Sequence, residues 1–144
     1  MLISKSEIIS LAYISSITEA ELKDEIISTV ISKYIVPIVP PDIYQQATED
    51  PEAYTVLIET HIKPCIAFYV KYFHINQLLM ESRSYLPSDN QITKTISKEF
   101  ASEILIIAEQ KSLDLAIYVK ANYNSPTSSK KLINGFLIWT PQKN

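Results

Sequence analysis

The stretch HIKPCIAFYVKYFHINQLLME, residues 61–81, decides the fold, because large apolar side chains occupy most positions of a helix-length segment. The polar side chains in and around it repeat along one stripe at helical spacing: Glu59, Lys63, Lys71, His74 and Glu81. This stripe continues in phase across Pro64, so we expect one kinked helix from about Pro51 to Glu81. Two helices that meet at Pro64 are the alternative. A helix with so little polar surface has to be buried on several sides.

Helix-start signals recur along the rest of the chain. A capping box is a short hydroxyl side chain followed three residues later by Glu or Gln, and it satisfies free amides of the first helical turn. Such boxes pair Ser4 with Glu7, Thr18 with Glu21, and Ser88 with Gln91. Asp50 followed by Pro51 is a further start, because Asp caps well and Pro suits the first helical position.

These starts, with the apolar spacing behind them, predict about four helices, two of them long. We expect them over residues 4–13, 18–36, 51–81 and 88–123. Pro37 ends the second helix, the segment 38–49 has room for one short helical turn, and residues 82–87 form a loop. The predicted fold class is therefore an all-α bundle with a small C-terminal β-strand or hairpin tail.

The composition is that of a globular domain and excludes several functional classes. Of the 144 residues, 47% are hydrophobic and 20% are charged, and the net charge of −3 gives no general attraction to nucleic acid. The single glycine, Gly135, argues against glycine-rich phosphate loops, and the single cysteine, Cys65, excludes an internal disulfide. The chain shows no secretory signal and no membrane-spanning run, so we expect a cytosolic protein without cofactors or membrane partners.

Two residue pairs at helical spacing raise the question of catalysis. His61 and Cys65 lie four residues apart, which suits a metal site or an activated thiol. The metal needs a further ligand and only the distant His74 is of the right kind, so we favour a buried cysteine beside a half-exposed histidine. Glu99 and Glu103 form a similar pair, but lysines nearby favour a solvated helix face. We therefore predict no enzyme.

Aromatic and basic residues raise the question of nucleic-acid or partner contacts. Nine tyrosines suggest stacking on bases, but Tyr69 and Tyr72 are flanked by apolar residues, which favours core packing and no sequence-specific nucleic acid. Arg83, the only arginine, falls in the predicted loop. It either binds a carboxylate or phosphate of a partner, or stays solvated.

The C-terminal segment holds the other candidate partner-binding residues. NSPTSS, residues 124–129, is a linker by composition, so we divide the chain into a helical domain, 1–123, and a linker with an apolar tail, 124–144. As a strand the tail is apolar on both faces and needs cover from a neighbouring subunit, from a local hairpin at Asn134-Gly135, or from its own helices. The candidate residues are Leu132, Ile133, Phe136, Leu137, Ile138 and Trp139.

The order of these elements resembles a known family. The apolar opening MLIS leads into the capped helix SKSEIISLAYI, and the amphipathic segment ITEAELKDEIISTVISKYI follows, before longer helices and an extended tail. Over residues 1–123 this pattern resembles the head–tail connector proteins (adaptor or head-completion proteins) of tailed bacteriophages. The resemblance implies a homo-oligomeric, commonly dodecameric ring beneath the portal protein, whose tails or loops reach neighbours or the next neck protein. It also implies a place in the neck of the virion after synthesis in the host cytoplasm.

These observations lead to two functional hypotheses. The first is a structural ring subunit that joins the capsid portal to the tail by subunit packing and tail exchange, without catalysis. The second is a monomeric helical module for protein binding or regulation, whose tail folds back on its own helices.

Overall fold

The structure is a computed structural model that describes residues 2–13, 17–85 and 91–123, with side chains described outside 81–99. These residues form α-helices and short 3-10 or π-helical segments, and none of them is in a strand. The α-helices are α1 (Lys5–Ala12), α2 (Asp24–Val30), α3 (Pro41–Glu49), α4 (Lys63–Tyr85) and α5 (Gln91–Asn122). The short segments are η1 (Glu19–Glu21), η2 (Ile31–Ile35), η3 (Pro51–Tyr54) and η4 (Val56–Ile62). The all-α class is thus confirmed for this part of the chain.

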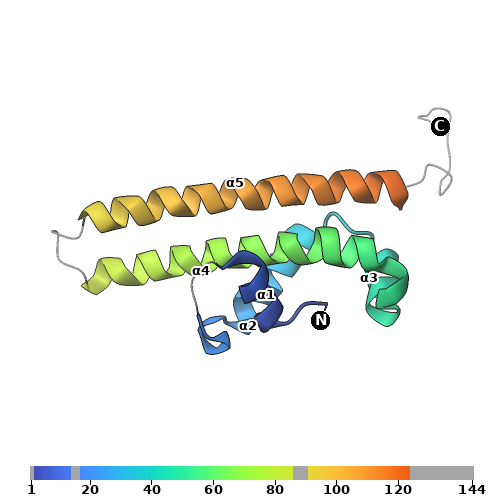
Figure 1. Cartoon of the computed structure of the whole chain (residues 1–144), viewed down its shortest axis with the longest axis horizontal. Helices are drawn as coiled ribbons and strands as arrows, with labels where there is room; N and C mark the ends of the chain where they lie inside the picture. Colours follow the sequence, from blue (N-terminus) through green and yellow to red (C-terminus); the bar gives the residue numbers. More distant parts are fainter. Residues whose placement is uncertain (1, 14–16, 86–90, 124–144) are drawn as a thin grey trace.

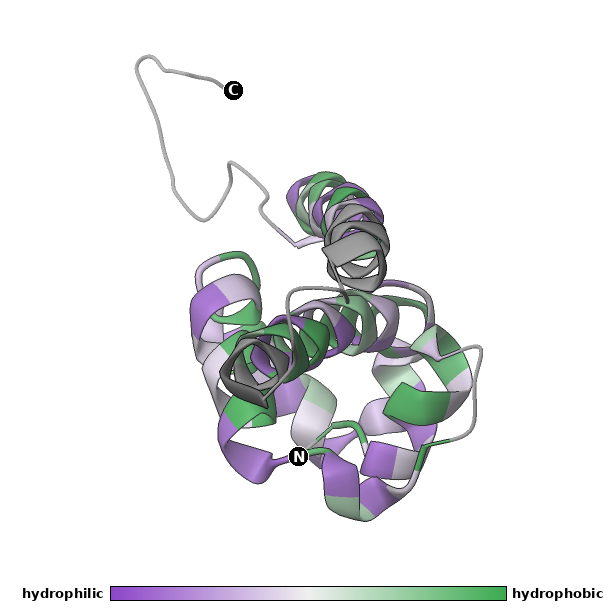
Figure 2. Ribbon diagram, turned by 90° about the vertical axis from the view of Figure 1, so that its left-hand side faces the viewer, coloured by the Kyte–Doolittle hydropathy of each residue, from purple (hydrophilic) through white to green (hydrophobic). Residues whose placement is uncertain are grey.

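The helices stack in layers with α4 in the middle (Figures 1 and 2). The long helices α4 and α5 lie side by side, while α1, α2 and α3 lie on the side of α4 away from α5. Helix α4 packs against α1, α2 and α5, whereas α5 packs chiefly on α4 and η4. The prediction that the central helix is covered from several sides is therefore confirmed.

The core lies around the central helix and draws side chains from both outer layers. Its largest fully buried residues include Ile8, Leu22, Ile27, Ile35, Leu57, Ile62, Ile66, Ile104 and Leu115. Burial of a side chain of this size contributes about 1.5–3 kcal/mol, so packing on α4 is the main stabilising force of the fold.

The chain stays helical across Pro64, as the phase of its polar stripe predicts. The π-helical η4 leads directly into α4, and the amide of Lys63 donates to the carbonyl of Ile58, five residues back. A π turn is wider than an α turn, so the ring of Pro64 and its missing amide are accommodated without ending the helix. The π-helical η2 likewise comes shortly before a proline, Pro37. There the amide of Val36 donates to the carbonyl of Ile31, five residues back, at 3.0 Å.

The start of the first helix agrees with the sequence, and the second differs. Ser4 and Glu7 form the predicted capping box. The box at Thr18 forms as well, since its amide donates to Glu21 Oε2 at 3.0 Å, but it starts only the short η1. The backbone is then extended at Leu22, whose side chain enters the core, and α2 begins at Asp24. The prediction of one helix over residues 18–36 was therefore wrong, because the burial of Leu22 interrupts that helix.

Two other boundaries differ from prediction. In place of one short turn, α3 has nine residues, with Pro41 at its first position. Helix α4 continues to Tyr85, so residues 82–85 are helical and not part of a loop. The capping residue Ser88 and the predicted β tail in 124–144 lie outside the described residues.

The one-sided packing of α5 can be tested with two neighbouring leucines. Leu115 is fully buried, so Leu115→Ala is expected to lower the free energy of unfolding by about 2–5 kcal/mol through loss of packing. Leu113 is 54% exposed, so the matched change Leu113→Ala is expected to cost less than about 1 kcal/mol. Urea unfolding of dilute protein measures both values, and equal losses would contradict the placement of α5.

Candidate functional site

An open groove lies where the end of α1 meets α4 and α5. Two adjoining hollows, of about 340 and 220 Å³, make up this groove, and Tyr13, Lys71 and Phe100 line both of them. We call it the α1–α4–α5 groove. Its rim carries partly exposed large apolar side chains, and its other apolar lining comes from all three helices and the segment after α1. The apolar lining includes Leu11, Phe68, Ile75, Leu78, Ile104 and Ile107.

A buried lysine lies at the floor of this groove. Lys71 is only 5% exposed, and its Nζ donates to the carbonyl of Ala12 at 2.8 Å. Ala12 is the last residue of α1, so the ammonium sits at the negative end of the helix dipole. The rings of Tyr13 and Phe100 lie 5.4 and 5.0 Å from Nζ and also favour the positive charge. Burial lowers the pKa of Lys71, and these contacts hold α1 against α4.

A tyrosine–histidine pair completes the polar part of the floor. The Tyr13 hydroxyl and Nδ1 of His74 lie 2.7 Å apart, and His74 is 4% exposed. Burial, with the charge of Glu21, raises the pKa of Tyr13, so the hydroxyl keeps its proton at neutral pH. The hydroxyl and the ring nitrogen share one hydrogen bond, whose direction follows the tautomer of His74. The groove therefore combines an apolar rim with polar floor groups that have hydrogen-bond partners within the fold.

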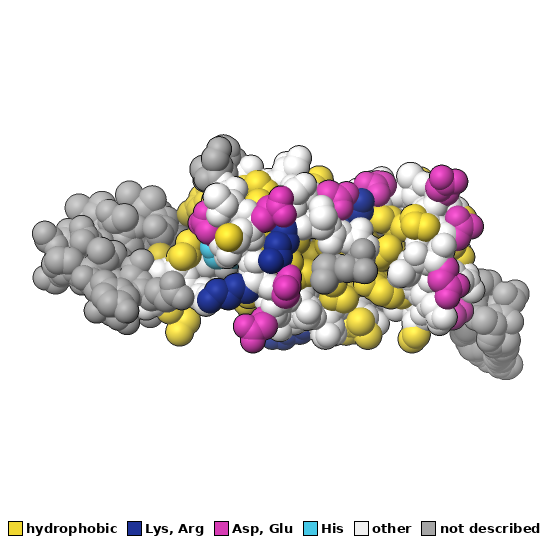
Figure 3. All heavy atoms as spheres, turned by 90° about the horizontal axis from the view of Figure 1, so that it is seen from below, with side chains coloured by type: hydrophobic (Ala, Val, Ile, Leu, Met, Phe, Trp, Pro, Cys, Tyr) yellow, Lys and Arg dark blue, Asp and Glu magenta, His cyan; other side chains and the backbone are white. Residues whose placement is uncertain are grey.

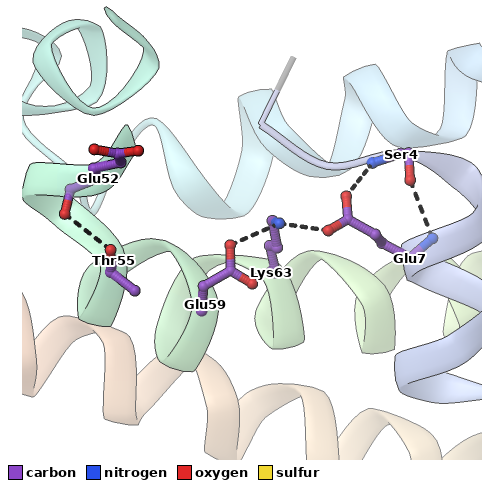
Figure 4. Close-up of polar contacts among 6 residues, drawn as sticks. All are labelled: Ser4, Glu7, Glu52, Thr55, Glu59 and Lys63. Carbon is purple, nitrogen blue, oxygen red and sulfur yellow. Dashed lines mark hydrogen bonds and ion pairs between the residues drawn. The ribbon is translucent and has the colours of Figure 1, made fainter. Parts of the chain in front are cut away.

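A second polar cluster ties the capping box of α1 to the central helix (Figure 4). Glu7 Oε1 accepts from the amide of Ser4 at 2.9 Å, while Glu7 Oε2 accepts from Lys63 Nζ at 2.5 Å. Lys63 also pairs with Glu59 at 2.8 Å. Burial lowers the pKa of Lys63, but hydrogen bonds to Glu59 and Glu7 outweigh it, so the pKa is raised overall. This cluster is a structural ion pair between α1 and α4.

The histidine–cysteine pair has the geometry of core packing. Cys65 is fully buried, and burial raises the pKa of its thiol to about 12, so the thiolate is scarce at neutral pH. The His61 ring stacks on Tyr118 with centroids 4.3 Å apart, and burial lowers its pKa. The interpretation of a buried cysteine beside a half-exposed histidine is confirmed. Within residues 2–13, 17–85 and 91–123, no His, Cys, Asp and Glu side chains gather into a metal site.

The other sequence candidates have different outcomes. Arg83 lies within α4, not in a loop, because the helix extends past the predicted end. Glu103 is exposed on α5, and the side chain of Glu99 lies outside the description. The six apolar tail residues, Leu132 to Trp139, also lie outside it, so their role in partner binding stays a prediction.

Sequence reasoning missed an exposed apolar stripe on α5. Ile106, Leu113 and Ile117 are 65%, 54% and 59% exposed. The sequence contained a signal for this exposure, because adjacent apolar residues such as Ile106 and Ile107 cannot both lie on the same face of a helix. We call the side of α5 turned away from α4 the outer face of α5.

Charge is uneven over the surface. Acidic side chains gather at the end of the molecule that holds α3 (Figure 3), where Asp42, Glu49, Asp50 and Glu52 are exposed. This end presents negative charge to any partner and repels phosphate.

No known protein family, curated protein or solved structure matches this chain. Among the described residues, none of the helices combines the length and the apolar character that crossing a membrane requires.

The ion pair at Glu7 gives the protein a pH-dependent stability. The hydrogen bond from Lys63 lowers the pKa of Glu7 below its ordinary 4.5, so the unfolded state takes up the proton first on acidification. The stabilisation is therefore present above that ordinary value and is lost as pH falls through the lower folded pKa. Glu7→Gln keeps the capping box and removes the charge.

We expect Glu7→Gln to melt below the wild type at pH 7, and the difference to close at acidic pH. Thermal unfolding followed by circular dichroism measures it. The exposed acid Glu19 serves as control, and Glu19→Gln is expected to shift the melting temperature less. If the difference in melting temperature between Glu7→Gln and the wild type stays constant with pH, the ion pair is contradicted.

The burial of Cys65 predicts slow thiol chemistry. Native protein is expected to react with a thiol reagent at neutral pH at least about a hundred times more slowly than urea-unfolded protein, because both burial and the raised pKa suppress the thiolate. Absorbance of the released chromophore follows the reaction. Comparable rates in the two states would show that Cys65 is accessible.

Proposed function

We propose that this chain is a structural subunit of the head–tail junction of a tailed bacteriophage. It would assemble with copies of itself as a ring, between the portal protein and the next neck protein, without catalysis. The observation that carries this proposal is the α1–α4–α5 groove, an open groove with an apolar rim on a small helical body whose sequence also has an apolar tail. The resemblance of the element order to connector proteins supports it further.

The groove suits an extended apolar segment. Leu11, Phe100 and Ile107 are 42%, 40% and 41% exposed along its rim, so a docked segment would cover apolar surface that now faces solvent. The tail residues 132–139 have large apolar side chains on both faces of a strand. Insertion of one subunit's tail into the groove of the next is thus the contact that would join copies head to tail.

The length of the linker supports a second candidate, the monomeric helical module. Residues 124–131 span up to about 28 Å when extended, at about 3.5 Å per residue. The path from Tyr123 back along α5 to Ile107 is about 24 Å, at about 1.5 Å per residue. The tail therefore also has the reach to fill the groove of its own chain.

Deletion of residues 130–144 separates the two candidates. For a ring subunit we expect unchanged helical circular dichroism and an unchanged melting temperature, with loss of assembly on the portal protein. For the monomeric module we expect a lower melting temperature, because a docked tail would bury several large side chains worth about 1 kcal/mol or more each. Light scattering and thermal unfolding measure these outcomes, and a full-length protein that stays monomeric even with its portal would refute the ring.

A change at the groove rim tests the docking site itself. Ile107→Glu places a charge among the apolar rim residues and is expected to reproduce the effect of the deletion. Val56→Glu is the matched control, because Val56 is 52% exposed on η4, away from the groove. Equal effects of the two changes would exclude the groove as the tail site.

A further inference from the structure

The outer face of α5 has the features of a helix–helix interface that lacks its partner. Helix α5 packs on α4 and η4 with one side, and it forms the outermost layer of the fold (Figure 2). Its exposed residues Ile106, Leu113 and Ile117 follow one another at seven- and four-residue steps, so they lie on one stripe. More than half of each of these side chains is solvent-accessible, which is unusual for so regular a set.

Exposed polar residues complete the stripe. Steps of three and four residues run through Glu103, Ile106, Gln110, Leu113, Ile117 and Lys120, all of which are exposed. Alternating steps of this kind define the seam of a coiled coil. The seam covers 17 steps along α5, or about 26 Å at about 1.5 Å per residue. Glu103, at one end, also borders the α1–α4–α5 groove.

The residues along the seam of one copy are complementary to the seam of a second copy that runs in the opposite direction. In an antiparallel pair related by a two-fold axis between Gln110 and Leu113, Ile106 of one copy faces Ile117 of the other. Glu103 then faces Lys120, and the two-fold axis repeats this opposite-charge contact at the other end. In a parallel pair in the same register, Glu103 would face Glu103 and Lys120 would face Lys120, and both contacts repel.

The flanks of the seam agree with the antiparallel arrangement. In the antiparallel geometry the flanking Glu109 is near Ala116 of the second copy, and Asp114 is near its Ile107. Like charges do not meet there. Gln110 would face Leu113 across the axis, and a polar residue at a seam position fixes the register at some cost in affinity.

We propose that the outer face of α5 binds a second copy of this chain, antiparallel and two-fold symmetric. The pair closes on itself, so it differs from the head-to-tail contact that a ring repeats, and it does not depend on the proposed function. It would hold the free protein as a dimer before other assembly. A seam of this length is at the small end of protein interfaces, so the dimer should be reversible and concentration-dependent.

Charge reversal in the full-length protein tests the pairing. Sedimentation velocity over a concentration series is expected to show a monomer–dimer equilibrium. Glu103→Lys and Lys120→Glu should each weaken it roughly five-fold, because two exposed attractions become two repulsions. The double variant should restore it, while Glu52→Lys, the same charge change at an exposed residue outside the α5 seam, should leave it unchanged. Leu113→Asp should abolish the dimer.

Cysteine cross-linking tests the orientation. A mixture of Ile106→Cys and Ile117→Cys proteins is expected to form a mixed disulfide, whereas each variant alone places its thiols about 16 Å apart along the seam, too far to bond. Disulfides within either variant alone would indicate a parallel pair and overturn the proposal.

The remaining outcomes also decide the matter. A protein that is monomeric at every concentration, or a dimer unaffected by the charge reversals, overturns the pair. A dimer that disappears on deletion of residues 130–144 would place the tail, not a second α5, at the contact. Because the α5 pair needs no tail, its failure is distinguishable from failure of the proposed ring.

Discussion

The helix that passes through Pro64 has to be covered on several sides, and the rest of the fold follows from this requirement. Apolar side chains occupy most of the circumference of α4, and water cannot satisfy them. Helices α1 and α2 cover one side of it and α5 the other. The widened turn of η4 is what allows this helix to remain continuous across a residue that lacks an amide. The layered arrangement is thus the simplest way to cover one long apolar helix.

Because single helices cover α4, the sides of those helices that face away from it remain in solvent. Helix α5 packs on α4 with one face, whose buried residues are Ala101, Ile104, Ala108, Leu115 and Val119. Its remaining apolar residues are then exposed at the rim of the α1–α4–α5 groove and on its outer face. These two exposed regions of α5 are therefore apolar surface that no other part of the described chain covers.

Local signals predicted much of the fold, and tertiary contacts account for the rest. The capping box at Ser4, the unbroken helix through Pro64 and the extent of α5 depend on residues close together in the chain. The break at Leu22 depends on a distant core. The groove floor was beyond prediction, because Tyr13 and His74 are 61 residues apart in sequence and only packing brings them together. The candidates Arg83 and the apolar tail were identified by residue type, which does not reveal location.

Glu7 joins the start of α1 to its attachment on the central layer. One oxygen of its carboxylate bonds the amide of Ser4 and the other bonds Lys63, and a carboxylate has lone pairs enough for both. Fraying of the first turn of α1 would therefore also deprive a mostly buried ammonium of a counter-charge. Such a penalty couples local opening to loss of tertiary contact, so the N-terminal helix should exchange its amide hydrogens as part of one cooperative unit with the central helix.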